Sequence, residues 1–363
     1  MNDDKNKKSA LTVNSGIPQP PSISLDSVSK FIQKKKKQYT VDEYVRGIVH
    51  GDIKILSQAI TIIESYLEEH QQIAREIIEK CLPYSGKAKR IGITGIPGVG
   101  KSTLIETFGK HITDQNLKLA VLAIDPSSEK SKGSILGDKT RMEDLSIDNN
   151  AFIRPSPSAG TLGGVAHKTR ETIILCEAAG FDVIFIETVG VGQSETVVHQ
   201  MVDVFLLLML TGAGDELQGI KRGIMEMADL FVITKADGTN ARKAVITKAQ
   251  VENAIHFFPA TDSGWIPRVQ TCSAQKKQGI SEIWNSILEY YEILNKNKFL
   301  ENKRLEQSRY WMYEAINDVL RSKFYNNHEI KSKLRTIEAD LMQGSISSYT
   351  AAMNLLKEYF KEM

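Results

Sequence analysis

Residues 95–103 read Gly-Ile-Pro-Gly-Val-Gly-Lys-Ser-Thr and directly follow the apolar run Ile91–Thr94. They match GxxxxGK followed by Ser or Thr, between a predicted strand and a helix predicted to begin near Lys101. Glycines let backbone N–H groups turn toward a phosphate, and the helix N-terminus adds partial positive charge. The stretch predicts a nucleoside triphosphate site, with Lys101 on the β- and γ-phosphates and the Ser102 hydroxyl on Mg²⁺. The residues expected to surround the phosphates are Gly95, Ile96, Pro97, Gly98, Val99, Gly100, Lys101, Ser102 and Thr103.

Short apolar runs recur downstream of this loop. They are Leu119–Ile124, Phe152–Arg154, Val183–Glu187, Val204–Leu210, Leu230–Thr234 and Gln270–Cys272. Buried strands of this kind, separated by helix-length segments, are typical of a mostly parallel sheet covered by helices on both faces. The sequence therefore predicts an α/β fold of the P-loop NTPase type, with helical extensions at both ends.

Acidic residues follow two of the predicted strands. Asp125 ends the second strand and Glu187 ends the fourth. Acids at the carboxyl ends of strands beside a phosphate loop are placed to hold Mg²⁺, directly or through water. Glu187 occupies the Walker-B position, whereas Asp125 has a turn cap as its alternative interpretation. Gln193 is a candidate for orienting the attacking water, with an ordinary surface glutamine as the alternative.

The nucleotide base is predicted by Thr234-Lys-Ala-Asp237, a variant of the NKxD guanine motif. The Asp237 carboxylate can accept from the ring N–H and the exocyclic amine of guanine, a donor pair that adenine lacks, and such a site rejects the analogue strongly. Lys235 can lay its aliphatic stem across the base. Ser273 and Ala274, after the next strand, fit the loop that supports the guanine carbonyl. We therefore predict GTP.

The chain is expected to have four parts: a disordered leader (1–25), an N-terminal helical segment (26–86), a GTPase domain (87–295) and a C-terminal helical arm (296–363). In the second part, an apolar stripe is predicted over Leu56, Ile60, Ile63 and Leu67. In the arm, apolar stripes begin at Trp311 and Met312 and need a partner surface. That partner is either the chain's own core or a second subunit.

Composition limits the kind of partner. With 46 Lys+Arg and 44 Asp+Glu, the formal net charge of +2 gives no general attraction to nucleic acid or anionic membranes. The strongly apolar run 204–210 is far shorter than the roughly 20 residues that span a bilayer. Cys81, Cys176 and Cys272 are far apart in the sequence and form no Cys-x-x-Cys pair. This pattern favours buried thiols in a reducing compartment. We expect a cytoplasmic protein.

Several motifs extend beyond a generic nucleotide site. They are GIPGVGKST (95–103), DPSS (125–128), GSILGDKTRM (133–142), FIRPSPSAGTLGG (152–164), ETVGVGQSE (187–195) and GAGDELQGIK (212–221). With them the chain, over about residues 40–290, resembles the MeaB/ArgK family of P-loop GTPases. The resemblance implies an adenosylcobalamin-dependent acyl-CoA mutase of the methylmalonyl-CoA mutase type as partner. It also implies a homodimer formed through the C-terminal helices.

The resemblance also implies roles for individual residues. Asp125, Asp138 and Glu187 would form the acidic Mg²⁺ shell with Ser102. A third switch loop, responsive to nucleotide, would contain Asp215, Glu216, Gln218 and Lys221. Lys221 would supply transition-state charge, with a solvated helix cation as its alternative interpretation. Thr234 departs from the usual asparagine, so one side-chain hydrogen bond in the base pocket is expected to be lost or weakened.

The predicted function is a molecular-switch GTPase that converts GTP to GDP and phosphate, gates cofactor loading and protects the mutase. One alternative is a small-molecule kinase of the amino-acid transport type, although no acceptor motif is recognisable. Another is a metal-insertion GTPase for a nickel enzyme. Such proteins usually contain Cys or His clusters, and here the histidines are scattered.

Overall fold

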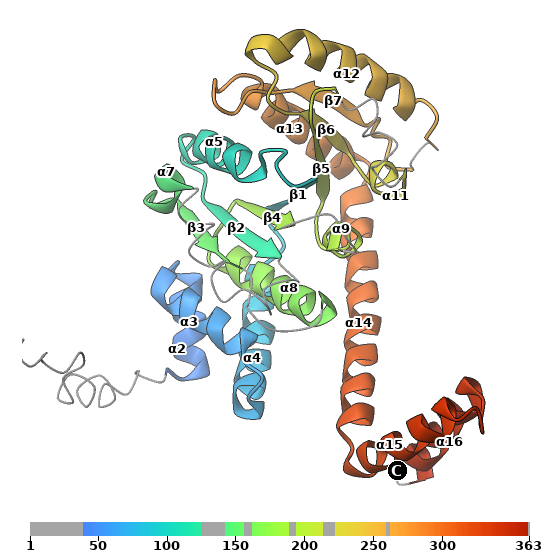
Figure 1. Ribbon diagram of the computed structural model, residues 1–363. Helices are drawn as coiled ribbons and strands as arrows, with labels where there is room; N and C mark the ends of the chain where they lie inside the picture. The colour runs from blue at the N-terminus through green and yellow to red at the C-terminus, as the bar shows by residue number, and fades with distance from the viewer. Residues whose placement is uncertain are drawn as a thin grey trace, which may run out of the picture. The chain divides into compact units, whose positions relative to one another are not determined.

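The computed structural model describes residues 39–124, 142–155, 162–188, 194–212, 222–258 and 262–361. Its sheet has seven parallel strands in the order β3-β2-β4-β1-β5-β6-β7 (Figure 1). The strands are β1 (Lys89–Gly95), β2 (Leu119–Ile124), β3 (Ala151–Arg154), β4 (Val183–Thr188), β5 (Val204–Met209), β6 (Leu230–Ile233) and β7 (Arg268–Thr271). The predicted α/β class is confirmed. Each predicted strand is present, with ends displaced by no more than a few residues.

Helices cover both faces of the sheet. Those of the GTPase region are α5 (Lys101–Thr113), α7 (Glu143–Ser146), α8 (Leu162–Ala178), α9 (Ser194–His199), α11 (Arg222–Glu226), α12 (Ala241–Ile255) and α13 (Ile280–Lys296). Ile91 and Ile93 of β1 share one core cluster with apolar residues of α5 and α13. Side chains alternate across a strand, so position 92 of β1 faces the opposite side of the sheet from Ile91 and Ile93. A Cβ atom added to Gly92 on that side would lie 3.1 Å from Cγ1 of Val198 in α9. Helix α9 therefore packs on the face opposite α5.

The N-terminal helices pack on α8 and on one another. They are α2 (Val41–Val49), α3 (Ile53–Glu64) and α4 (Glu68–Cys81), and the short 3₁₀ helix η1 (Leu82–Tyr84) follows. Leu56, Ile60 and Ile63 are buried as predicted. The prediction for Leu67 is wrong, because α3 ends at Glu64 and Leu67 caps the next helix with 63% of its surface exposed.

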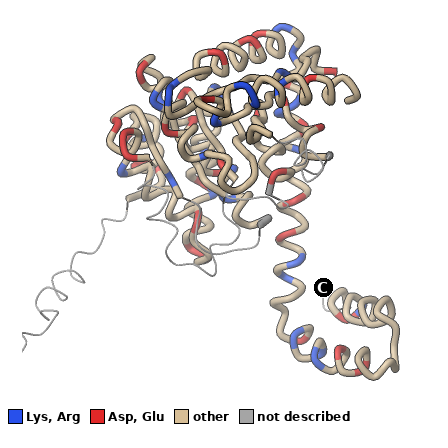
Figure 2. Tube along the Cα trace, turned by 45° about the horizontal axis from the view of Figure 1, so that its top comes forward, with Lys and Arg blue, Asp and Glu red and all other residues tan. Residues whose placement is uncertain are grey.

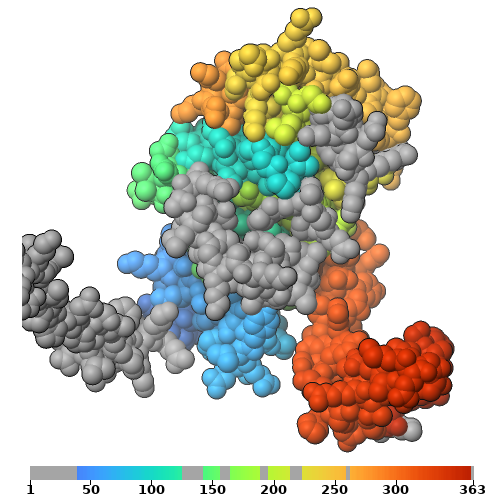
Figure 3. All heavy atoms as spheres, in the orientation of Figure 1, coloured from blue at the N-terminus to red at the C-terminus, as the bar shows by residue number. Residues whose placement is uncertain are grey.

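The chain ends in three helices after α13: α14 (Phe299–Asn326), α15 (His328–Met342) and α16 (Ser348–Lys361). The first half of α14 is part of the core, since Leu300, Gln307 and Trp311 are buried. Its second half exposes large apolar side chains, including Ile316 and Leu320. Helices α15 and α16 pack together at the end of α14, as Figure 3 shows.

Both signs of charge occur throughout the fold: basic and acidic residues are interspersed along the trace of the described elements in Figure 2. Cys81, Cys176 and Cys272 are free and buried, as predicted. Burial raises the pKa of the Cys81 thiol to about 11 and that of Cys272 to about 12, so both stay protonated near neutral pH. Within the described residues, no helix has the length and apolar character needed to cross a bilayer.

Candidate functional site

The loop between β1 and α5 has the backbone that a phosphate cradle needs. Gly95, Gly98 and Gly100 have φ values of 155°, 79° and 100°, which side-chain-bearing residues rarely adopt. At Gly95 a Cβ would lie 2.7 Å from the carbonyl oxygen of Leu208. Helix α5 begins at Lys101 with Gly100 as its N-cap. The predicted strand–loop–helix arrangement is present.

Lys101 lies under this loop with 8% of its surface exposed. Its Nζ donates to the carbonyl oxygens of Gly95 (2.7 Å) and Ile96 (3.4 Å). Burial lowers the pKa of Lys101, while the charges of Glu187 and Glu195 act in the opposite direction and favour the ammonium. Both carboxylates therefore favour the charged form of Lys101.

Glu187 lies at the carboxyl end of β4, in register with Ile93 of β1, and is buried. The next residue, Thr188, forms a hydroxyl–hydroxyl hydrogen bond of 2.8 Å with Thr94, the residue before the phosphate loop. This bond joins the strand that carries the acid to the strand that carries the loop. Glu187 and Ser102 provide oxygen atoms, the ligands that Mg²⁺ prefers. Among the residues with described positions, no cluster of three or more His, Cys, Asp or Glu side chains could hold a metal.

The base motif is tied to the phosphate loop by two side chains. Lys235, in a left-handed conformation with φ 55°, donates from Nζ to the carbonyl oxygen of Gly98 at 2.8 Å. The hydroxyl of Thr234 lies 2.7 Å from the carbonyl oxygen of Val99 and 3.2 Å from that of Met209. Since a hydroxyl has one hydrogen, the shorter contact to Val99 is the main bond. Thr234 thus links the base motif to the loop despite replacing the usual asparagine.

The second piece of the base site joins the first. The Ser273 hydroxyl donates to the Asp237 carboxylate, and the N–H of Ala236 donates to the carbonyl oxygen of Cys272 at 3.0 Å. The carbonyl of Ala274 accepts from the hydroxyl of Thr107 in α5 at 3.2 Å. The two sequence pieces predicted to hold guanine therefore meet beside the helix that follows the phosphate loop.

Seven predicted site residues lie outside the described residues: Asp125, Asp138, Gln193, Asp215, Glu216, Gln218 and Lys221. The described phosphate and base residues are brought together around one end of the sheet. Two features of the site were not predicted. The link from Thr234 to the loop was missed because a threonine departs from the motif, and Glu195 because it ends its motif without a recognised function.

A parallel sheet with a glycine-rich phosphate loop, a buried acid at the end of β4 and a Lys-x-Asp base motif defines a P-loop GTPase. A family model described as "Methylmalonyl Co-A mutase-associated GTPase MeaB" matches residues 56–329. The chain belongs to this family, and its members' GTPase activity and guanine-nucleotide binding apply to it.

Individual relatives agree with this assignment. GTPase ArgK of Escherichia coli is 43% identical over 316 residues, covering 87% of this chain and 96% of that protein. The mouse protein "Methylmalonic aciduria type A homolog, mitochondrial" is 43% identical over 334 residues, covering 89% and 80% respectively. A crystal structure of an LAO/AO transport system kinase superposes with a TM-score of 0.71 at 37% identity, covering 89% of this chain and 98% of that one.

Proposed function

We propose that this GTPase is a Mg²⁺-dependent molecular switch that gates cofactor loading of an adenosylcobalamin-dependent acyl-CoA mutase and protects that mutase. The observation that carries the nucleotide part is the direct attachment of the base motif to the phosphate loop, through Lys235 to Gly98 and Thr234 to Val99. The mutase part is supported by the family description and by the name of the mouse relative. We further propose that the protein acts in the cytoplasm.

In the proposed mechanism, Lys101 moves from the loop carbonyls to the β- and γ-phosphates. There it neutralises charge as water attacks the γ-phosphorus and the bond from that phosphorus to GDP, the leaving group, breaks. Mg²⁺, when bound, would neutralise further phosphate charge. Ser102 would be its ligand and Glu187 would hold its water shell. Asp125 and Asp138 are proposed to complete this acidic shell, and Gln193 to orient the attacking water.

Asp237 is proposed to select guanine, with Ser273 orienting its carboxylate. A carboxylate that would accept from two donors of guanine would be left without them when adenine binds, which makes adenine costly. Asp215, Glu216, Gln218 and Lys221 are proposed to form the loop that senses nucleotide and contacts the mutase, with Lys221 supplying transition-state charge.

A homodimer is proposed from the second half of α14. A long helix that exposes Ile316, Val319 and Leu320 on one stretch has apolar area to bury against a partner. The predicted boundary of this arm at residue 296 stays a prediction, and the burial of Trp311 favours an arm that begins to leave the core only after that residue.

The test is GTP hydrolysis by the purified protein, alone and with an adenosylcobalamin-dependent acyl-CoA mutase from the same genome. We expect slow hydrolysis alone, at least tenfold stimulation by the mutase, and co-elution of the two proteins. Hydrolysis that no such mutase changes would contradict the proposed partner and leave the GTPase assignment standing.

The relative called a transport system kinase makes phosphotransfer the competing function. It is tested in the same assay with γ-labelled GTP and a mixture of amino acids. Label appearing only in inorganic phosphate supports the switch, whereas label appearing in an amino acid would replace it with a kinase.

A further inference from the structure

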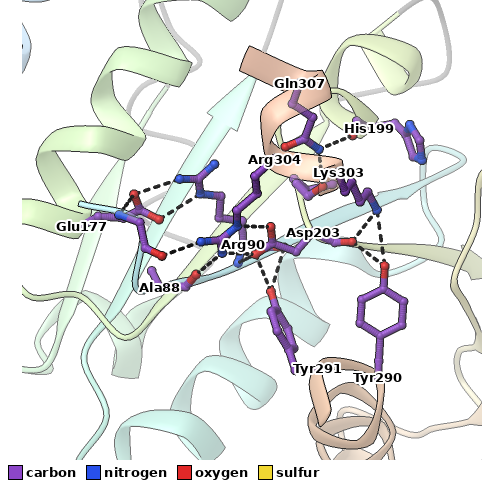
Figure 4. Close-up of polar contacts among 12 residues, drawn as sticks. Ala88, Arg90, Glu177, His199, Asp203, Tyr290, Tyr291, Lys303, Arg304 and Gln307 are labelled. Carbon is purple, nitrogen blue, oxygen red and sulfur yellow. Dashed lines mark hydrogen bonds and ion pairs between the residues drawn. The ribbon is translucent and has the colours of Figure 1, made fainter. Parts of the chain in front are cut away.

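Helix α14 holds the chain segment that links α9 to β5 (Figure 4). The indole Nε1 of Trp311 donates to the carbonyl oxygen of Gln200 at 2.8 Å. The amide Nε2 of Gln307 donates to the carbonyl oxygen of Val202 at 2.7 Å and approaches that of His199 at 3.4 Å. Gln307 and Trp311 are 5% and 3% exposed, so water does not compete for these bonds.

The two short bonds are accepted by Gln200 and Val202, in the turn that follows α9, whereas His199, the last residue of the helix, receives only the 3.4 Å contact. The last carbonyls of a helix have no partner within the helix and must be satisfied by other groups. Helix α9 has only six residues, Ser194–His199, which is too short to be stable without outside contacts. Side chains of α14, about a hundred residues further along the chain, therefore hold the turn that follows α9, while the helix itself packs on α8, β4 and β1.

The other end of α9 lies at the nucleotide site. Glu195, in its first turn, is 1% exposed, and its charge acts on Lys101 together with that of Glu187. One turn later, Val198 packs directly over Gly92 of β1, two residues before Thr94. A shift of the far end of this short helix would move Glu195 relative to the phosphate loop.

We propose that Gln307 and Trp311 are positioning residues for GTP hydrolysis, which hold the turn after α9 and thereby fix where Glu195 lies relative to the phosphate loop. Helix α14 is then part of the catalytic framework, in addition to being the stem of the C-terminal helices. The inference rests on the GTPase activity and is independent of the proposed mutase partner. Displacing a charged group by about 1 Å can cost about 10²-fold in rate, so hydrogen bonds this far from the phosphates can affect turnover.

The test uses the full-length protein and Trp311→Phe, which keeps one aromatic ring and removes the donor together with part of the buried volume. We expect kcat for GTP to fall five- to tenfold, while KM for GTP and the Kd for GDP change less than twofold. Arg309→Ala is the matched control, because Arg309 lies on the same helix and pairs only with exposed Glu306 among its described contacts. It should retain the wild-type kcat. Wild-type kcat in folded Trp311→Phe would overturn the proposal.

Gln307→Met, which removes the amide donor at similar length, is the second variant and decides the matter if Trp311→Phe does not fold. A double-mutant comparison then separates positioning from a general loss of stability. If α14 acts through Glu195, Gln307→Met combined with Glu195→Gln should lose no more kcat than Glu195→Gln alone. If the losses of kcat in the two single variants multiply in the double variant, α14 does not act through Glu195. A rise of KM equal to the fall of kcat would show the same.

Discussion

Asp203, at the entrance to β5, and Arg304, in α14, form a two-point ion pair at the end of the sheet where β5 begins. Arg304 donates from Nε to Oδ1 at 2.8 Å and from Nη2 to Oδ2 at 2.6 Å, and Asp203 is fully buried. Burial alone would raise the pKa of Asp203, but the hydrogen bonds and charge of Arg304 outweigh it and lower that pKa. The carboxylate is therefore ionised at neutral pH.

Removing one partner of this pair should be costly, because the other charge stays buried. We expect Arg304→Met to lower the free energy of unfolding by about 3–5 kcal/mol, measured by urea denaturation. Tyr291 also donates to Asp203, at 2.7 Å, and cannot replace the lost charge. The control is Lys333→Met, whose ion pair with Glu358 is over 40% exposed and should contribute less than about 1 kcal/mol. Equal losses in the two variants would contradict the importance of burial.

The role of the Thr234 hydroxyl can be separated from its size. Thr234→Val keeps the shape and removes the donor to the Val99 carbonyl, leaving a buried acceptor unsatisfied at a cost of about 1–3 kcal/mol. We expect kcat/KM for GTP to fall about tenfold, because the loop loses one of its attachments to the base motif. Thr234→Ser retains the hydroxyl and should stay within about twofold of wild type. Steady-state hydrolysis would show this, and a Val variant as active as the Ser variant would contradict it.

Base selection is tested by Asp237→Asn. An asparagine amide can donate to the additional carbonyl of xanthine, whereas the native carboxylate can only accept. We expect kcat/KM for GTP to fall at least about 10²-fold and xanthosine triphosphate to become the better substrate. Competition between the two nucleotides in one assay is the measurement. A variant that still prefers GTP would show that another group selects the base.

Much of the site was predictable from the sequence because its motifs combine local backbone requirements with side-chain chemistry. The glycines at 95, 98 and 100 have the positive φ values that their pattern predicts. The strands were readable because a buried parallel strand is apolar on both faces. Sequence gave no comparable signal for Asp203 and Arg304, which are separated by 101 positions and resemble ordinary surface residues in a linear reading.

The same limit applies to α14. Its sequence predicts an amphipathic helix, yet periodicity does not say which stretch of the stripe is buried by the chain itself. The structure shows that Trp311 is buried and that Met312, one position later, is half exposed. Trp311 is buried because it contacts the segment between α9 and β5. This tertiary contact leaves no pattern in the local sequence.

Stability should depend on pH through His199. Burial and the nearby charge of Lys303 lower its pKa from 6.5 to about 4, so the folded protein favours the neutral ring, which packs edge-on against Phe205. The unfolded chain binds a proton more readily between these two values, so this stabilisation is complete above pH 6.5 and decreases as pH falls toward 4. At pH 5.0 the loss should be about 2 kcal/mol.

His199→Phe isolates this contribution, since other groups titrate in the same range. Between pH 7.5 and pH 5.0, the free energy of unfolding of the variant should fall by about 2 kcal/mol less than that of the wild type, as measured by denaturation at the two pH values. A wild type and a variant with identical pH dependence would show that His199 does not titrate differently in the folded protein.

The C-terminal arm leads to a prediction about assembly. Ending the chain after Tyr313 retains Trp311 and its hydrogen bond to Gln200, and removes the stretch that exposes Ile316, Val319 and Leu320. If that stretch forms the dimer contact, light scattering should give twice the 40.5 kDa chain mass for the full-length protein and a single-chain mass for the truncated one. Ile316→Glu in the full-length chain should have the same effect, because a desolvated charge in an apolar contact costs several kcal/mol. A truncated chain that remains dimeric would place the contact elsewhere, on the part of the molecule that the truncation retains.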